Sequence, residues 1–497
     1  MNFQIPNFLP AIAEIFQASM ALLILLIISF CRHSARASRI AFWLSLTTLL
    51  AVGAYHFLFF AEIDFAFGQM FFDDPIGDVL KSAASFCVAA VLIYGRRHLQ
   101  ERNLESPEYY IIVLLAALGI CVLISAGSLV TIYIGLELLS LASYALVALD
   151  RDSVRSTEAA MKYFVLGALA SGLLLYGMSM VYGATQSLNL VDIAIALNPD
   201  NVDAQVSRTV LLFGLVFLMA GIAFKIGLVP FHMWIPDVYE GAPTPVTLFI
   251  ASTPKLAAFA MAYRLLAIGM WDLAEHWQRM LLIVGMSSIV LGNLAAIAQT
   301  SFKRMLAYSG ISHMGFMVLG LASFLQGSQE FAQRSQESAY SSALFYVLTY
   351  ALTALAAFGI LLLFTRNGRE LESIDDFRGL GKTHGWWAGM MAVVMFSMAG
   401  IPFFVGFFSK FYILHALLSA GHLWLAVAAV MMSLIGAFYY LRVVKVMFFD
   451  APAEACTVAA GFGVRSMLSA NVLAIAVIGI YPGLLMDICF LVVHLSM

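Results

Sequence analysis

Charged residues are the feature that this sequence has least of. Only 11% of the residues are charged, whereas a soluble domain has about 25%. Hydrophobic residues make up 62% of the chain, and no polar stretch is long enough to fold as a separate soluble domain. No basic tail is present for nucleic acid, and the net charge of −3 indicates no class of partner. Most of the surface is therefore expected to face lipid.

The sequence also lacks the motifs that hold redox cofactors. It contains no GxGxxG and no P-loop, so we expect no site for NADH or flavin in this chain. The cysteines form no CxxC pair and no Cys/His cluster, which argues against an iron–sulfur cluster or a metal site. The five of them are scattered at Cys31, Cys87, Cys121, Cys456 and Cys489. We expect no metal and no cofactor in this chain.

Long apolar runs recur along the whole chain. Each is long enough to cross a hydrocarbon core of about 30 Å. They predict an all-α polytopic membrane protein with about 14 transmembrane helices. The expected spans are 9–30, 40–60, 78–95, 109–127, 128–149, 158–183, 209–229, 243–266, 280–299, 304–325, 340–365, 386–418, 421–449 and 467–493.

The loops between these spans alternate in basic content without a break. One set holds most of the lysines and arginines, and the opposite set holds only Arg208, Arg279 and Arg334. Cytoplasmic loops are the basic ones, so both termini are predicted to face away from the cytoplasm. Lys81 and Arg264 lie near the outer ends of their spans, and we expect them to snorkel to the headgroups.

Five other ionisable residues lie too deep in their spans to reach water. They are Glu137, Lys225, Lys255, His313 and Lys410. A charge at the centre of a membrane helix costs about 2.5–3.5 kcal/mol, and such residues are functional candidates by default. A structural ion pair would explain the first two equally simply. A core histidine bonded to a carbonyl would explain His313.

Helix-breaking residues accompany the deep lysines. Pro230 follows Lys225, Pro254 precedes Lys255, and Gly400, Pro402 and Gly406 precede Lys410. Interior prolines free a carbonyl that protein or water must satisfy. We therefore predict that helices 7 and 12 are broken. The two helices cross in opposite directions, which is typical of an inverted repeat.

These motifs carry a family resemblance over residues 109–450. The stretch AFKIGLVPFHMWIPDVYEGAPTPVTLFIASTPKLAAFAMAYRLL resembles the antiporter-like membrane subunits of bacterial NADH:quinone oxidoreductase (respiratory complex I). DVYEGAPTPV and STPKLAAFA resemble the subunit N family in particular, and GLELLSLASYALVALDR, SFKRMLAYSGISHMGF and AGIPFFVGFFSKF fit in the same order.

The resemblance implies two inverted five-helix repeats, at 109–266 (helices 4–8) and 267–450 (helices 9–13). A three-helix segment at 1–108 precedes them, and a C-terminal helix at 451–497 follows. It implies proton carriers at Glu137, Lys225, Lys255 and Lys410. His313 is a candidate relay from its depth in the tenth span, beside the alternative of a core histidine. The expected location is the bacterial inner membrane.

The expected function is proton translocation coupled to oxidation of NADH by quinone in partner subunits. Those partners would hold NADH, flavin, iron–sulfur clusters and quinone, and they include other antiporter-like subunits and small helical subunits. A lysine kept away from water releases its proton more readily than a lysine on the surface, so the buried set can carry protons. Three alternatives stay open: a subunit of a multi-subunit sodium/proton antiporter, a non-conducting membrane scaffold, and a subunit of a membrane-bound hydrogenase.

Overall fold

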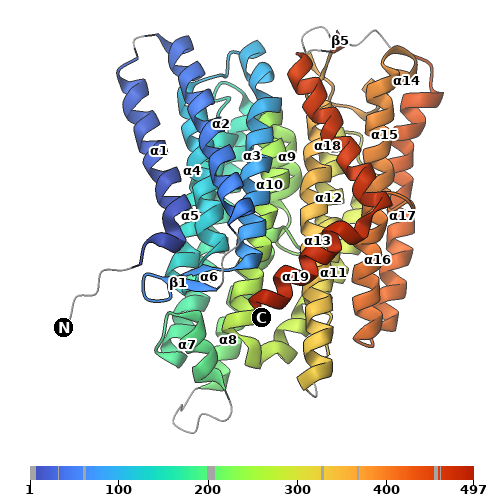
Figure 1. Cartoon of the computed structure of the whole chain (residues 1–497). Coiled ribbons are helices and arrows are strands. Elements are labelled where there is room, and N and C mark those ends of the chain that lie inside the picture. Colours follow the sequence, from blue (N-terminus) through green and yellow to red (C-terminus); the bar gives the residue numbers. More distant parts are fainter. Residues whose placement is uncertain are drawn as a thin grey trace.

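A computed structural model of the whole chain shows long helices standing side by side (Figure 1). It describes residues 7–31, 33–59, 63–198, 207–325, 329–366, 369–452, 457–458 and 461–497. Within these ranges, 12 helices are long and apolar enough to cross a membrane, and shorter apolar helices accompany them. The prediction of an all-α polytopic membrane protein is confirmed.

The helices of the first half correspond closely to the predicted spans. They are α1 (Ile12–Ser29), α2 (Ser34–Leu58), α3 (Pro75–Glu101), α4 (Pro107–Ile124), α5 (Leu129–Val147), α6 (Val154–Thr185), α7 (Leu190–Leu197), α8 (Arg208–Ile226), α9 (Trp234–Gly241) and α10 (Thr244–Ala262). A π-helical turn, Tyr263–Gly269, continues α10. Cys456, which the sequence analysis named, lies outside the described ranges.

The second half contains the remaining helices, again close to the predicted spans. They are α11 (Ala274–Ile297), α12 (Phe302–Leu321), α13 (Gln329–Leu361), α14 (Leu380–Thr383), α15 (Gly385–Ala399), α16 (Val405–Ser419), α17 (Leu423–Phe449), α18 (Phe462–Ile480) and α19 (Pro482–Ser496).

In the described part of the chain, short strands lie at the two ends of the bundle. The hairpin of β1 (Asp64–Ala66) and β2 (Phe71–Asp73) is antiparallel, and Phe65 pairs with Phe72. At the opposite end, β3 (Phe364–Arg366) lies between β4 (Arg369–Glu370) and β5 (Thr457–Val458). The end with the hairpin is also where α1 begins and α19 ends (Figure 1).

Local sequence fixes where the helices begin. Asp74, Ser106 and Ser128 accept hydrogen bonds from the backbone of the first turns of α3, α4 and α5. Such side chains satisfy donors that a helix leaves unpaired at its start. Proline occupies the first position of α3 and of α4, where no amide hydrogen is needed.

The helix α10 is the centre of the molecule, and every one of its residues is buried. It contains Pro254 in its interior and packs against α3 and α13. Since α3 belongs to the first segment and α13 to the second half, α10 joins the three parts of the chain. A lysine on this helix cannot reach lipid.

The predicted breaks in helices 7 and 12 are confirmed. Helix α8 ends at Gly227, whose φ of +88° lies in the left-handed region, and α15 ends at Gly400 with φ of +86°. Only glycine adopts this conformation without strain. Each break therefore leaves the last carbonyls of a helix without their usual intrahelical partners.

Two expectations were wrong in detail. The fourteenth span is two helices, α18 and α19, because Pro482 cannot continue α18. Lys81 and Arg264 do not snorkel: their side chains are 0% and 3% exposed and pair with buried carboxylates. The boundaries at 108, 266 and 450 stay predictions.

Candidate functional site

Glu137 on α5 and Lys225 on α8 each bond to a serine on another helix. The Nζ of Lys225 donates to the Oγ of Ser140 at 2.9 Å, and Ser171 on α6 donates to the carboxylate of Glu137. Among the described contacts, no ion pair joins Glu137 to Lys225. A carboxylate and an ammonium group thus share one site without being locked together.

Lys255 lies at the break in α8. Its Nζ donates to the carbonyl oxygen of Ile226 at 2.8 Å, and it lies 5.5 Å from the centre of the Trp234 ring. The carbonyl belongs to the last residue of α8, directly before Gly227. Lys255 therefore supplies the hydrogen bond that the broken helix lacks. Its charge and that of Lys225 are close enough to repel each other.

Lys410 has the same arrangement at the second break. Its Nζ donates to the carbonyl oxygens of Met398 and Ala399, both at 3.0 Å, and to the Oγ of Ser433 at 2.8 Å. The two carbonyls belong to the last turn of α15, directly before Gly400. Each half of the chain thus contains a helix break with a buried lysine on it.

His313 on α12 is held by two tyrosines. Its Nδ1 lies 2.7 Å from the hydroxyl of Tyr346, and its Nε2 lies 3.0 Å from the hydroxyl of Tyr440. Tyr440 also bonds to Ser309. Because both ring nitrogens meet hydroxyl groups that donate and accept, His313 is part of a hydrogen-bond chain, whereas a core histidine bonded to a backbone carbonyl was the other expectation.

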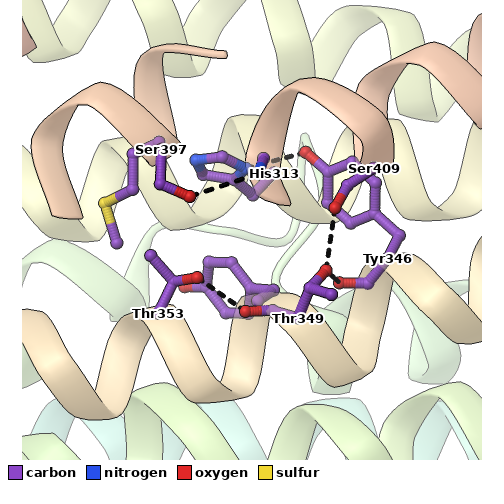
Figure 2. Close-up of a pocket in the computed structure, with 9 residues that line it drawn as sticks. His313, Tyr346, Thr349, Thr353, Ser397 and Ser409 are labelled. Carbon is purple, nitrogen blue, oxygen red and sulfur yellow. Dashed lines mark hydrogen bonds between the residues drawn. The ribbon is translucent and has the colours of Figure 1, made fainter. Parts of the chain in front are cut away.

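A small cavity lies beside His313 and beside Met398 and Ser409, which neighbour Lys410. It has a volume of about 20 Å³, which is room for about one water molecule. Figure 2 shows His313, Tyr346, Thr349, Ser397 and Ser409 around it. Met398, whose carbonyl accepts from Lys410, also lines this cavity.

The site residues do not form one continuous chain of hydrogen bonds. Within the described ranges, no hydrogen bond joins Lys255 to His313, and the gap lies between α10 and α12. Water would have to complete the connection. The sequence-predicted residues are therefore grouped as a pair at Glu137 and Lys225, a capped break at Lys255, and a second group at His313 and Lys410.

A cavity of about 330 Å³ is lined by acidic and basic side chains of α6, α9 and α12. Asp237 accepts from Lys162 at 2.8 Å and from Arg304 at 2.9 Å. Burial alone would raise the pKa of Asp237, but Lys162 and Arg304 outweigh it and hold that pKa below its usual range. Asp237 is therefore a permanent anion at neutral pH.

Sequence reasoning missed the hydroxyl partners of the site. The set consists of Ser140, Ser171, Ser433, Tyr346 and Tyr440. Serines and tyrosines are common in membrane helices, so only their spatial neighbours mark them. The available signal is helical spacing, since Ser140 lies three positions after Glu137 and thus on the same face of α5.

Comparisons with known proteins agree on one family. The profile described as "NADH:quinone oxidoreductase/Mrp antiporter, TM" matches residues 126–436. The protein named NADH-quinone oxidoreductase subunit N of Azoarcus sp. (strain BH72) is 57% identical over 100% of this chain and 99% of its own length. The protein of the same name from Thiobacillus denitrificans is 50% identical over 98% of each chain.

Solved structures share the fold over almost the whole chain. A chain of respiratory complex I from Thermus thermophilus has 30% identity and a TM-score of 0.79, covering 96% of this chain and 98% of that one. A chain of the Mrp complex from Dietzia sp. DQ12-45-1b has 20% identity and a TM-score of 0.81, with 99% and 98% covered. At 20% identity the second likeness shows the fold alone.

Proposed function

The chain belongs to the subunit N family of NADH-quinone oxidoreductase, and from that premise we propose which of its side chains move protons. The protein is a multi-pass, proton-translocating membrane subunit of this complex. Both full-length relatives named above are subunit N. The alternatives of an antiporter subunit and of a scaffold are therefore not better supported.

One observation carries the assignment of residues. Lysines at Lys225, Lys255 and Lys410 are buried at bilayer depth, and each contacts only hydroxyl or carbonyl groups among its described hydrogen bonds. Hydrogen bonds to neutral groups offset only part of the desolvation free energy of an ammonium group, so the charged form stays costly without an anion in contact. A lysine kept for structure alone would be paired with a carboxylate. Side chains in such surroundings exchange protons near neutral pH.

Glu137 and Lys225 form the loading step. A carboxylate close to an ammonium group favours the charged form of the lysine, and separating the two favours release of the proton. Each group bonds to its own serine and no described ion pair joins them, and in this proposal that arrangement stands for the unloaded form. Movement of α5 against α8 would switch Lys225 between the loaded and the unloaded form.

Lys255, His313 and Lys410 form the onward route. Repulsion between Lys225 and Lys255 means that a proton on one disfavours a proton on the other. Water between α10 and α12 would carry the proton to His313, whose tyrosine partners lead toward the small cavity beside Lys410. Lys410 would then exchange the proton with the outer half of the membrane.

Partner subunits carry the redox chemistry in this proposal. The related structure is a multi-subunit respiratory complex I, and the sequence motifs for NADH, flavin and clusters are lacking here. We place the chain in the bacterial inner membrane beside other antiporter-like subunits and small helical subunits. Both termini lie on the periplasmic side, as the basic loops indicate.

Three lysine-to-methionine variants test the assignment in the complete complex reconstituted into vesicles. Lys225→Met, Lys255→Met and Lys410→Met each keep most of the length of the side chain and remove the titratable amine. We expect proton pumping per NADH oxidised to fall while the complex still assembles. Lys445→Met is the matched control, because the side chain of Lys445 is 62% exposed and pairs with Asp450.

The same experiment separates the scaffold alternative. A scaffold predicts that the three buried variants lower the yield of assembled complex and leave pumping per NADH unchanged. Full pumping in Lys225→Met would defeat the assignment of Lys225. Dependence of pumping on sodium rather than on the lysines would favour the antiporter alternative.

A further inference from the structure

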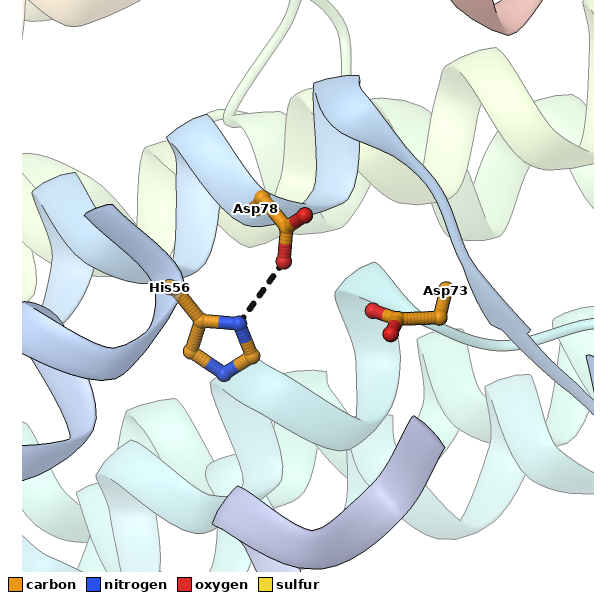
Figure 3. Close-up of side chains that lie close together, drawn as sticks. All are labelled: His56, Asp73 and Asp78. Atoms are coloured by element: carbon orange, nitrogen blue, oxygen red, sulfur yellow. Dashed lines mark hydrogen bonds and ion pairs between the residues drawn. The ribbon is translucent and has the colours of Figure 1, made fainter. Parts of the chain in front are cut away.

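A second buried group of ionisable side chains lies on the first three helices and on the β1–β2 hairpin, outside residues 126–436. It consists of Glu14 on α1, His56 on α2, Asp73 on β2, and Asp78 and Lys81 on α3; we call it the N-terminal cluster. Figure 3 shows that His56, Asp73 and Asp78 point toward one another. None of these residues belongs to the row at Glu137, Lys225, Lys255 and Lys410.

The contacts within the N-terminal cluster are close. The Nδ1 of His56 lies 2.8 Å from the Oδ1 of Asp78, and the Nζ of Lys81 lies 2.8 Å from the Oε1 of Glu14. Lys81 also lies 3.8 Å from the Oδ1 of Asp73. These five residues are at most 9% exposed.

The charges within the cluster do not balance. Three carboxylates face one ammonium group, and a neutral imidazole adds nothing, so two negative charges are in excess. A net negative charge in buried surroundings is costly. Binding of a proton or of a cation would therefore lower the free energy of the cluster.

Two atoms of the cluster await a partner. The Oε2 of Glu14 and the Nε2 of His56 have no hydrogen bond among the described residues. Glu14 is 6% exposed and His56 is 1% exposed, and the Nε2 atom lies 4.0 Å from the Oε1 of Glu14. A carboxylate oxygen in such a place is satisfied when it carries a proton.

Distances favour protons over a metal ion. Two ligands of a tetrahedral zinc ion lie about 3.3–3.5 Å apart, given bonds of about 2.0–2.2 Å. The 2.8 Å between His56 and Asp78 is a hydrogen-bond distance. The ammonium group of Lys81 already lies against Glu14 and Asp73, so a metal ion would have to displace it.

Asp73 connects the cluster to the aqueous phase at the end where α1 begins. Its side chain is 12% exposed and lies on the β1–β2 hairpin. Burial raises the pKa of Asp73 to about 7, although Lys81 opposes the rise. The other titratable groups around the cluster are Tyr55, Asp74, Cys121 and, paired with Asp74, Arg264.

We propose that Glu14, His56, Asp73, Asp78 and Lys81 form a second proton-binding site, which exchanges protons with the aqueous phase through Asp73. Uptake transfers a proton from hydronium to a carboxylate and leaves water, and release is the reverse. The site does not depend on the roles proposed for the buried lysines. Asp74, the residue that follows Asp73, accepts from Arg264 in the π-helical turn that continues α10. The cluster therefore lies next to the end of α10.

An apolar carbodiimide tests the proposal, since it modifies protonated carboxyl groups in apolar surroundings. A cavity of about 700 Å³ between α3, α13, α18 and α19 has His56 in its wall and gives the reagent a route. The intact complex in membranes is treated with dicyclohexylcarbodiimide between about pH 6 and about pH 9, and modified peptides are quantified by mass spectrometry. We expect modification of Glu14 or Asp73 that falls about tenfold per pH unit above the apparent pKa of the cluster.

Variants sharpen the result. Glu14→Gln should abolish modification at that position, and Lys81→Met should move the pH profile to higher pH, because loss of the ammonium group disfavours the carboxylates. Glu275, whose side chain is 60% exposed, is the control and should stay unmodified. Absence of modification at the lowest pH, or modification independent of pH, would overturn the proposal. Protection by micromolar Zn²⁺ would also overturn it, in favour of a metal site.

Discussion

Lys255 donates to the carbonyl oxygen of Ile226 at 2.8 Å, so a residue of α10 completes the end of α8. Lys410 completes the end of α15 in the same manner through Met398 and Ala399. In both halves the lysine contacts the weakest point of a broken helix. A change in the charge of either lysine therefore acts directly on the geometry of a break.

The charge of Glu137 should contribute more to proton pumping than the hydrogen bond that Glu137 accepts from Ser171. Glu137→Gln removes the anion that favours the loaded form of Lys225, and we expect the rate of proton pumping to fall by about 10²-fold. Ser171→Ala removes only the donor to Glu137, and we expect a loss of about tenfold. Pumping by reconstituted complex provides the measurement, and equal losses in the two variants would contradict this ranking.

The break in α8 requires a glycine. Gly227 has a φ of +88°, and an added Cβ would lie 2.0 Å from the Cδ1 of Ile235 and 3.5 Å from the Nζ of Lys255. Gly227→Ala should lower the stability of the complex by about 1–2 kcal/mol from backbone strain alone and slow pumping by shifting the carbonyl of Ile226.

Gly172→Ala is the matched control for that variant. Gly172 lies within α6, and nothing lies within 4 Å of an added Cβ. Alanine is favoured over glycine inside a helix by about 1 kcal/mol, so this change should leave thermal stability unchanged or raise it. Equal thermal midpoints for the two variants in detergent would contradict the role of the break.

Glu370 should stabilise the complex over a wide pH range. Its Oε2 lies 3.2 Å from Lys303, and its Oε1 lies 2.5 Å from His98. Burial alone would raise the pKa of Glu370, but Lys303, then His98 and Arg102, hold it well below its usual range. A depressed pKa gives a contribution that is present above the unfolded value of about 4.3 and is lost as pH falls through the folded value.

Glu370→Gln should therefore destabilise the complex by about 3–5 kcal/mol, as loss of one partner of a buried pair does. The difference in thermal midpoint from the wild type should be the same at about pH 8 and about pH 5. Glu372→Gln is the control, since its side chain is 68% exposed and its pair with Arg155 is worth little. A difference that shrinks between the two pH values would mean that Glu370 titrates there.

The hydroxyl of Tyr440 should contribute to proton transfer at His313. Tyr440→Phe removes the partner at 3.0 Å from Nε2, and we expect pumping to slow about two- to tenfold. Tyr340→Phe is the matched control, because the buried hydroxyl of Tyr340 accepts from Gln336 and has no described bond to His313. If both variants pump alike, His313 has only a structural role.

The spans and the deep ionisable residues were accessible from sequence because both depend on position along a single helix. Hydropathy alone located the helices, and proline and glycine located the two breaks. Lys81 was misplaced because depth alone suggested snorkelling, while its partner Glu14 lies on another helix. The serines beside Lys225 and Glu137 were missed because the local pattern can place Ser140 on the same face of α5 as Glu137, but it does not show which residue of another helix a side chain contacts.

The hydroxyl groups of Ser140 and Ser433 can bond to Lys225 and Lys410 in either protonation state of the lysine. A hydroxyl accepts from an ammonium group and, after rotating, donates to the lone pair of a neutral amine. Lys225 and Lys410 therefore need not swing to a new partner when the proton leaves. In the proposed route, proton release at these two positions would begin with a reorientation of hydrogens around fixed heavy atoms, before any movement of α5 against α8 changes the position of Glu137 relative to Lys225.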